Sequence, residues 1–492
     1  MERYILLATI LLSVLNTNLV AQTETPATQW PQFRGVDGQN RYSDQVPIEF
    51  GPGINELWST EIAAGHSSPI IWGGQIFLTG ADDARLYVVC LSRDSGKLQW
   101  QRDFKVEFET DYFHNDCSPA SPTCCTDGER VYSYFGDYGV IAHDLSGNEI
   151  WQKRFAHVPQ PFGFGSSPIL HDGKLIVARD VPQFGGVFCF DAASGEEKWM
   201  IPRPGGRGSF STPVVWKNDT GAELVVGGSG TLNGYDLDSG KSLWVVNNLP
   251  ALACTSPVAT KQLLVYGAWT TAHVTGVERT ESGFDDDIKF TEQELVDPVA
   301  LATRFDENGD GKIAREELPA SRMKEAFRFL DANNDGFLAG QEITGFFNSP
   351  AAPGRNVIVG IRPGGRGDIT ETHVEWEAFK QLPYVASPVV HDDSVFYVKK
   401  GGFLTRVNLS DGQNVYTKRL GVGGEYYATP IAAGDKLIVC AERGTVFVVD
   451  PKGKMEVLST NAIGGDIAAT PAIVDNTLYL RTTNRLSAFR SK

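Results

Sequence analysis

The sequence predicts an all-β protein: an eight-bladed β-propeller of four-stranded antiparallel blades, with a small α-helical module inserted in the fifth blade. Three observations support this prediction. A Ser-Pro or Thr-Pro step followed by an apolar run recurs eight times, mostly near every 45 residues. A tryptophan closes most of these units. Glycine makes up 52 of 492 residues, above the usual level of roughly 7%, as many tight turns between short strands require.

The repeated steps define the blades. They are Ser68-Pro69, Ser121-Pro122, Ser167-Pro168, Thr212-Pro213, Ser256-Pro257, Ser387-Pro388, Thr429-Pro430 and Thr470-Pro471. Their spacings are 53, 46, 45, 44, 131, 42 and 41 residues, so one interval is too long by about 87 residues. Seven intervals separate eight units, and the long interval places an insertion in the fifth unit.

Each unit contains four short β-rich segments. In the first unit these lie over residues 67–72, 73–80, 85–92 and 96–100, bounded by Gly, Asp or Asn. Four strands in about 45 residues are typical of a propeller blade. An aromatic residue closes most units: Trp100, Trp151, Trp199, Trp244, Trp376 and, in the sixth unit, Tyr416. We expect these rings to fill the gaps between adjacent blades.

The last unit is one strand short. It starts at Thr470 and reaches Phe489 without room for a fourth strand, whereas Trp58 near the N-terminus belongs to no unit of its own. We therefore expect the strand near residues 56–58 to complete the last blade and close the ring.

These features resemble the PQQ-like (pyrroloquinoline-quinone-type) β-propeller repeat family with tryptophan-docking motifs. The matching phrases are Trp30-Pro31-Gln32-Phe33-Arg34-Gly35, Thr126-Asp127-Gly128-Glu129-Arg130-Val131-Tyr132 and Leu478-Tyr479-Leu480-Arg481-Thr482. More narrowly, the chain is similar to secreted bacterial BamB-like propellers and to quinoprotein dehydrogenases. The family contains enzymes and scaffolds, so the resemblance implies the fold but leaves the function open.

Residues 1–21 have the pattern of a signal peptide. Arg3 precedes an apolar run over residues 5–15, and the small residue Ala21 marks the expected cleavage point. A run of about 11 residues is too short to span a bilayer of roughly 30 Å. We expect a periplasmic or secreted protein with no membrane anchor. Its seven cysteines form no metal-type CxxC pair and are expected to be buried small residues.

The long interval contains two twelve-residue segments, 306–317 and 331–342, that fit the EF-hand template. Ca²⁺ takes oxygen ligands from positions 1, 3, 5, 7 and 12 of such a loop. The expected ligands are Asp306, Asn308, Asp310, Lys312 and Glu317 in the first loop, and Asp331, Asn333, Asp335, Phe337 and Glu342 in the second. Lys312 and Phe337 occupy position 7, which contributes a backbone carbonyl. We expect a helix from Pro298 to Phe305 before the first loop.

The distribution of charge and the lengths of the repeat intervals divide the chain into four segments. The net charge is −16 at a pI near 5.0, which argues against nucleic acid as a partner. Residues 278–342 hold 17 acidic and 8 basic residues, a net of −9, so more than half of the charge belongs to the insertion. The expected divisions are a signal peptide (1–21), a first propeller part (22–277), the EF-hand insertion (278–352) and a second propeller part (353–492).

An active site is harder to place. Quinoprotein dehydrogenases carry adjacent cysteines that form a disulfide ring over the cofactor, but Cys124-Cys125 is only two residues before Asp127-Gly128, the wrong register. Neighbouring strand residues also point to opposite faces. The motifs therefore do not support PQQ binding. Other polar candidates are His114-Asn115-Asp116, Arg179-Asp180, and the hexapeptide Arg-Pro-Gly-Gly-Arg-Gly, present at 203–208 and 362–367.

The leading hypothesis is a secreted, calcium-binding propeller that acts as a binding or scaffold protein, with a protein or polysaccharide ligand at one face. The alternative is a PQQ- and calcium-dependent quinoprotein dehydrogenase that oxidises alcohols or sugars. The sequence leaves catalytic and cofactor-binding residues unassigned.

Overall fold

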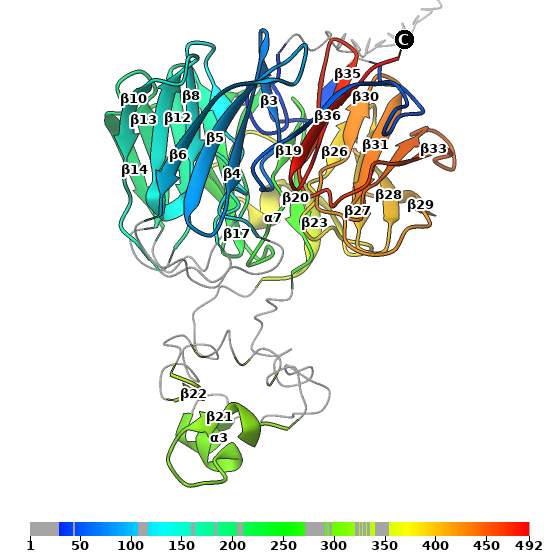
Figure 1. Cartoon of the computed structure of the whole chain (residues 1–492). Helices are drawn as coiled ribbons and strands as arrows, with labels where there is room; N and C mark the ends of the chain where they lie inside the picture. The colour runs from blue at the N-terminus through cyan, green and yellow to red at the C-terminus, as the bar shows by residue number, and fades with distance from the viewer. Residues whose placement is uncertain are drawn as a thin grey trace, which may run out of the picture.

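The computed structural model describes residues 29–42, 45–106, 117–158, 163–181, 185–203, 210–270, 291, 293–294, 298–319, 324, 327, 331, 335–339 and 354–491. The predicted signal peptide and its cleavage point lie outside these residues. Figure 1 shows a disc of β-sheets arranged around a central axis, and the described part of the insertion as a separate small unit.

Eight sheets form the disc, as the sequence predicts. Blades 1 to 4 are β3 (Ile70–Trp72), β4 (Gln75–Ala81), β5 (Arg85–Ser92) and β6 (Leu98–Lys105); β7 (Cys125–Thr126), β8 (Arg130–Tyr134), β9 (Val140–Asp144) and β10 (Glu149–Lys153); β11 (Ile169–His171), β12 (Lys174–Arg179), β13 (Gly186–Asp191) and β14 (Glu197–Pro202); and β15 (Val214–Asn218), β16 (Gly221–Gly228), β17 (Thr231–Asp236) and β18 (Ser242–Val246).

Blades 5 to 8 follow the same order. They are β19 (Val258–Ala259), β20 (Leu264–Ala268), β23 (Val357–Ile361) and β25 (Val374–Ala378); β26 (Val389–His391), β27 (Ser394–Lys399), β28 (Phe403–Asn408) and β29 (Asn414–Arg419); β30 (Ile431–Ala433), β31 (Lys436–Ala441), β32 (Thr445–Val449) and β33 (Val457–Ala462); and β34 (Ala472–Val474), β35 (Thr477–Thr482) and β36 (Arg485–Phe489) with β2 (Glu56–Glu61).

The N-terminal strand closes the ring. Strand β2 pairs antiparallel with β36, with Trp58 opposite Ala488 and Thr60 opposite Leu486. The prediction that the segment near Trp58 completes the last blade is confirmed. The edge that β36 would otherwise expose is thereby covered.

The closing tryptophans connect each blade to the next. The indole Nε1 of Trp58 donates to the carbonyl of Arg93 in blade 1 at 3.0 Å, and Trp100 donates to Leu145 in blade 2 at 2.8 Å. A glycine of the next blade lies under five of these rings. A Cβ on Gly96 would come within 2.4 Å of Trp58, and Gly96 also has φ +67°. Both facts favour glycine here, and equivalent glycines at 147, 195, 240 and 412 lie against Trp100, Trp151, Trp199 and Trp376.

A closed ring of eight hydrogen bonds joins the blades near the axis. In each blade a backbone N–H donates to a Ser or Thr hydroxyl of the next blade, at 2.9–3.2 Å. We call this set the hydroxyl ring; its members are Ser68, Thr123, Ser167, Thr212, Ser256, Ser387, Thr429 and Thr470. The last bond runs from Thr470 back to Ser68, so the circle is complete.

Blade 2 corrects one sequence prediction. The Ser121-Pro122 step does not occupy the repeat position; Thr123 contributes the hydroxyl and Cys124 follows it in place of proline. Ser121 instead forms a local turn, in which its hydroxyl accepts from the N–H of Ser118 at 2.9 Å. The pattern was misassigned because a serine-proline pair of the turn lies just before the true repeat position.

Two short strands extend the blades beyond four. Strand β1 (Arg41–Tyr42) pairs parallel with β30 of blade 7, and β24 (Gly367–Asp368) pairs parallel with β18 of blade 4. The second of these belongs to the long connection between β23 and β25, so blade 5 also contributes to the outer edge of blade 4. A four-strand repeat pattern predicts neither addition.

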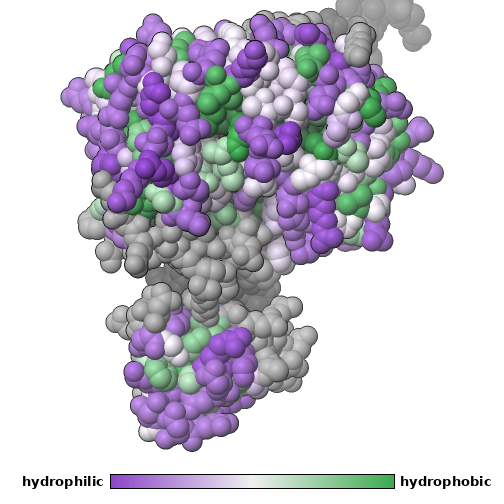
Figure 2. All heavy atoms as spheres, in the orientation of Figure 1, coloured by the Kyte–Doolittle hydropathy of each residue, from purple (hydrophilic) through white to green (hydrophobic). Residues whose placement is uncertain are grey.

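Apolar side chains fill the gaps between blades. The largest cluster joins blades 7, 8 and 1 and includes Trp30, Ile71 and Leu480, each no more than 1% exposed. Figure 2 shows hydrophilic residues over much of the outer side of the disc, with apolar residues in small patches among them. None of the described helices is long and apolar enough to cross a membrane.

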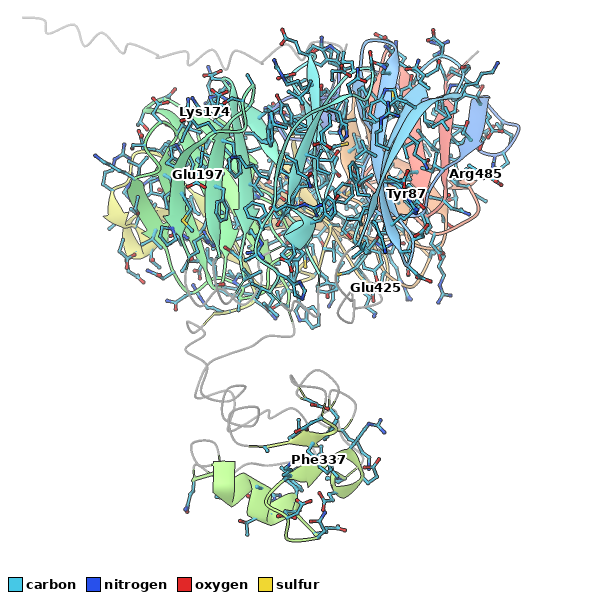
Figure 3. The ribbon with its side chains drawn as sticks, turned by 60° about the vertical axis from the view of Figure 1, so that its left-hand side comes forward. Tyr87, Lys174, Glu197, Phe337, Glu425 and Arg485 are labelled. Atoms are coloured by element: carbon cyan, nitrogen blue, oxygen red, sulfur yellow. The ribbon has the colours of Figure 1, made fainter. Side chains whose placement is uncertain are left out.

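The disc has two distinct ends. Each innermost strand runs from the hydroxyl ring toward a hairpin such as β11–β12, and we call this side the hairpin end. The insertion leaves the opposite side, between β20 and β23 of blade 5, and we call that the insertion end. Lys174 and Glu425 mark the two ends in Figure 3. The insertion thus lies in the fifth blade, where the repeat spacing places it.

Candidate functional site

The first inserted loop begins directly after helix α3 (Pro298–Phe305), where the sequence predicts a helix. The N–H of Asp306 donates to the carbonyl of Ala302 at 2.7 Å, so the last helical hydrogen bond leads into the loop. The carboxylate of Asp306 then accepts from the N–H groups of Gly309 (2.7 Å), Asp310 (3.1 Å) and Gly311 (2.7 Å). The chain therefore curls around the side chain at position 1. Gly311, at position 6, has φ +79°, which suits the sharp turn there.

Glu317 closes the same loop from its other end. Its Oε1 accepts from the N–H groups of Glu307 and Asn308, at 3.2 and 3.3 Å, while its Oε2 accepts from Ala314 at 2.7 Å. The carboxylate at position 12 thus reaches back to positions 2 and 3. Each of its oxygens has lone pairs beyond those used by the backbone.

The two loops are joined by a short ladder. Strand β21 (Ile313–Ala314) pairs antiparallel with β22 (Phe337–Leu338), with Ile313 opposite Leu338. Both of these apolar residues are buried, at 0% and 1% exposure. The ammonium of Lys312 lies 4.9 Å from the centre of the Phe337 ring. The side chain of Lys312 therefore packs against Phe337, and the expected calcium ligand at this position is the backbone carbonyl of Lys312.

The second loop repeats the first where the structure describes it. Asp331 accepts from the N–H groups of Asp335 at 3.0 Å and Gly336 at 2.9 Å. Figure 3 shows Phe337 in the inserted unit. The predicted ligands Asn333 and Glu342 lie outside the described residues.

The donor chemistry of the first loop fits a hard cation. Carboxylate, amide and carbonyl oxygens within twelve residues are the ligands that Ca²⁺ takes in proteins. In the described part of the chain, however, no three Asp, Glu, His or Cys side chains stand close enough together to hold a metal ion. The carboxylates of Asp306 and Glu317 accept from backbone N–H groups of the loop, and their oxygens keep further lone pairs that could contact an ion.

The adjacent cysteines do not form the ring of a quinoprotein. Cys124 packs with Ile70 and Phe77 between blades 1 and 2, whereas Cys125 packs with Tyr132 between blades 2 and 3. No disulfide joins them. Burial raises the pKa of Cys124 to about 12 and that of Cys125 well above its usual value, so neither thiol is reactive near neutral pH. The residues present do not fit the cofactor shield of PQQ enzymes.

Charged residues at the insertion end are arranged in pairs. Arg179 is ion-paired with Asp137, which also bonds His157 Nδ1 at 2.8 Å. Asp180 is paired with Arg203 at 2.8 Å. All these side chains except His157 are at most 10% exposed. The Arg179–Asp137 pair links blades 3 and 2, whereas Asp180 and Arg203 both belong to blade 3. The geometry favours a structural role for Arg179-Asp180. His114, Asn115 and Asp116 lie outside the described residues.

The hexapeptide copies do not form one site. Arg203 begins the first copy, which leads from blade 3 to blade 4, and residues 204–208 lie outside the described residues. In the second copy Arg366 bonds the buried carboxylate of Glu223 at 3.0 Å, and Glu223 accepts from Trp244 Nε1 at 2.8 Å. The second copy therefore fastens blade 5 to blade 4.

The N-terminal segment that contains Trp30 to Gly35 forms a structural element outside the repeated blades. Residues 29–42, which we call the N-terminal plug, cross the central channel on the hairpin side of the hydroxyl ring. The guanidinium of Arg34 donates to the carbonyls of Pro257 in blade 5 (3.0 Å) and Pro388 in blade 6 (3.1 Å). Asn40 donates to Pro430 in blade 7 at 2.7 Å. One end of the channel is thereby closed.

Sequence reasoning identified this phrase only through its resemblance to the family and missed its position. Trp30 forms a β-bridge with Ile71 of blade 1, and Gln32 Oε1 accepts from the N–H of Leu170 in blade 3 at 3.0 Å. Residues Trp30, Arg34 and Asn40 are at most 1% exposed. The unusual density of Trp, Gln, Arg and Gly in a segment outside the repeats was the available signal.

A cavity of about 310 Å³ lies between the plug and blades 3, 4 and 5. We call it the plug cavity. Its lining includes Arg41 from the plug, His171, Lys217 and Lys261 from the three blades, and the acidic residue Asp37.

Comparison with known proteins agrees with this fold. Residues 50–285 and 300–492 match a protein family described as outer membrane protein assembly factor BamB. The chain belongs to this family. The BamB-type match covers the whole ring of blades and most of the insertion, so the membership does not depend on a single blade.

Individual relatives of this BamB-type chain are distant. The chain is 23% identical over 418 residues to the outer membrane protein assembly factor BamB of Yersinia pestis, across 82% of this chain and 90% of that protein. It is also 23% identical over 235 residues to the quinoprotein alcohol dehydrogenase PedH of Pseudomonas putida, across 44% of this chain and only 36% of the enzyme.

Solved structures support the fold alone. BamB from Moraxella catarrhalis matches with a TM-score of 0.51 at 12% identity, across 88% of this chain and 98% of that one. A europium-containing methanol dehydrogenase matches with a TM-score of 0.50 at 13% identity, across 92% and 89%. A BamB and a methanol dehydrogenase therefore share this architecture.

Proposed function

We propose that this chain is an extracytoplasmic, calcium-binding β-propeller that acts as a binding or scaffold protein. The observation that carries the proposal is the geometry of the first inserted loop, where the carboxylates at positions 1 and 12, Asp306 and Glu317, organise the loop from both ends. The apolar residues of the β21–β22 ladder hold the second loop beside it.

Calcium would bind through oxygens already gathered in one short segment. Asp306, Asn308 and Asp310 would supply side-chain oxygens. Lys312 would supply its carbonyl, and Glu317 would supply a carboxylate. A bound divalent cation would neutralise part of the excess negative charge of residues 278–342. This neutralisation supports a stabilising role of the ion within the module.

The extracytoplasmic location rests on the signal-peptide pattern of residues 1–21 and on family membership. The binding or scaffold role rests on the assembly-factor relatives, which span most of the chain. A protein or polysaccharide ligand at a propeller face is consistent with both the extracytoplasmic location and the binding or scaffold role. The positions of Cys124 and Cys125 favour this role over a PQQ-dependent dehydrogenase.

Calorimetric titration of the whole chain with Ca²⁺ tests the ion-binding part. We expect Glu317→Gln to weaken calcium binding by at least roughly tenfold, because even partners outside the coordination sphere cause losses of that size. Glu316→Gln is the matched control, since the neighbouring carboxylate is exposed and occupies a position that is not a ligand in the template. Equal binding by both variants and the parent chain would show that this loop is not a calcium site.

A dye-linked oxidation assay tests the second part. The protein is incubated with PQQ and Ca²⁺ and offered primary alcohols and aldoses, with thermal unfolding measured in parallel. The scaffold proposal predicts a calcium-dependent shift in the unfolding of the inserted module and no PQQ-dependent turnover. Turnover together with a PQQ-dependent shift in Tm would replace the scaffold proposal with the dehydrogenase.

A further inference from the structure

The plug cavity has a charge opposite to that of the protein around it. Its lining contains four basic residues, Arg34, Arg41, Lys217 and Lys261, and one acidic residue, Asp37. The chain as a whole carries −16. The cationic groups come from the plug, blade 4 and blade 5, three parts of the chain that are far apart in sequence.

The carboxylates near the cavity do not neutralise the two lysines. Among the described residues, no ion pair at 4.0 Å or less involves Lys217 or Lys261. Asp37 accepts from the N–H of Gln39 at 3.0 Å, within its own turn. Arg34 differs from the lysines because its guanidinium is buried and is bonded to two proline carbonyls.

One of these cations, Lys217, acts on the cavity residue His171. Burial lowers the pKa of His171, Asp172 opposes that effect, and Lys217 and Lys174 add to it. Lys174 of blade 3 is itself paired with Asp238 of blade 4 at 2.9 Å. Lys217 therefore acts on His171 across the cavity without a carboxylate partner among the described residues.

We propose that the plug cavity binds a small organic anion, of the class of polycarboxylates and sugar phosphates. Three positive side chains that approach from different elements match a ligand with several negative oxygens. A volume of about 310 Å³ is at the lower end of small-molecule sites, which suits a ligand of monosaccharide size. Carboxylate and phosphate share the oxyanion chemistry that Arg and Lys recognise.

This site is separate from the calcium loops. The cavity lies at the hairpin end, on the hydroxyl-ring side of the β11–β12, β15–β16 and β19–β20 hairpins, whereas the insertion leaves blade 5 at the insertion end. The inference therefore goes beyond the proposed function and does not depend on calcium binding.

Calorimetric titrations with citrate, glucose 6-phosphate and neutral glucose test the proposal. They are run on the full chain at about 0.15 M salt, where exposed charges more than roughly 8 Å apart are largely screened. We expect at least one of the two anions to bind and glucose not to bind. The anion that binds more tightly identifies the carboxylate or the phosphate class.

The matched variants are Lys217→Gln with Lys261→Gln, and Lys241→Gln as the control. Lys241 is exposed on blade 4 but does not line the cavity. The double variant should lose roughly tenfold or more in affinity, since hydrogen bonds to charged groups contribute strongly, and the control should keep the parent affinity. An equal loss in the control, or binding of neither anion, would overturn the proposal.

The imidazole signal of His171 in ¹H NMR gives a readout that needs no lysine variant. It is assigned by its disappearance in His171→Gln. Because His171 lines the cavity, its signal should shift on titration with the anion that binds and stay in place with glucose. A calorimetric signal without movement of the His171 resonance would place the ligand elsewhere and reject this cavity as its site.

Discussion

The ring of blades and the inserted module are stabilised by different means. In the ring, hydrogen bonds pass from blade to blade until the last one returns to Ser68, and fully buried apolar side chains fill the gaps. In the module, the described polar contacts run mostly within single loops, and a two-residue ladder joins them. The comparison indicates that the ring depends on mutual packing of its repeats, whereas the described part of the module is organised by backbone N–H bonds to the carboxylates of its own loops.

Removal of an inter-blade tryptophan should have the largest effect on the ring. Trp58→Ala deletes the indole that joins blade 8 to blade 1 and leaves Gly96 without its packing partner. We expect a loss of about 3 kcal/mol or more in the free energy of unfolding, measured by urea titration. Trp269→Ala is the control, because Trp269 is 39% exposed and should cost clearly less. Equal losses would contradict the view that the ring depends on its closure.

Acid should weaken the ring through His143. Burial lowers the pKa of this side chain to about 4, and Arg102 adds to the effect. Because the unfolded chain binds the proton near pH 6.5, stability is highest above that pH and is lost as pH falls toward 4. This residue alone should account for about 2 kcal/mol between pH 7 and pH 5.

The measurement is the urea unfolding free energy of the parent chain and of His143→Gln at both pH values. The variant lacks the titrating group, so the pH-dependent difference between the two proteins should approach that amount. The same slope in both proteins would assign the acid sensitivity to other groups.

Loss of one member of the hydroxyl ring should have a smaller effect. Ser256→Ala leaves the buried N–H of Thr212 without its acceptor, and we expect a loss of about 1–2 kcal/mol in the unfolding free energy. Ser95→Ala, in an exposed turn of blade 1, should change stability by less than about 0.5 kcal/mol. A neutral Ser256→Ala would mean that water replaces the lost hydroxyl.

The smallest effect on the ring should come from the module. All ten tryptophans lie outside residues 278–352, so tryptophan fluorescence reports unfolding of the ring. Glu317→Gln, or calcium chelation, should change the ring's unfolding free energy by less than about 0.5 kcal/mol while it alters calcium binding. A large shift in the ring transition would show that the two regions are energetically coupled.

Much of the ring could be predicted from the sequence because its contacts repeat. A hydroxyl residue, a turn glycine and a closing Trp return at nearly fixed spacing, and each repeat has the same local environment. The shortage of one strand after Thr470 and the unassigned Trp58 then identified the closing strand. The prediction was wrong only at Ser121, where a turn imitates the repeat.

The non-repeating contacts could not be predicted in this way. The plug, β1 and β24 depend on pairings between segments that are distant in the chain, and no periodicity signals them. The plug cavity is formed by Arg41, Lys217 and Lys261 from three such segments, so its positive charge is not visible in any one stretch. The expected ligands of the two inserted loops were easier to identify, because each stretch of twelve consecutive residues contains the whole EF-hand pattern.

Closure by β2 has a consequence for the order of folding. Strand β2 pairs with β36, which lies more than 400 residues later in the chain, so β2 has no partner until β36 has been synthesised. Intermediates that lack the final blade expose the edges of blades 1 and 7, and unpaired strand edges favour association with other chains. A circular permutation with new termini in a hairpin of a middle blade would instead place β2 after β36 in the chain, with the plug between them, and would shorten the sequence separation of the closing contact.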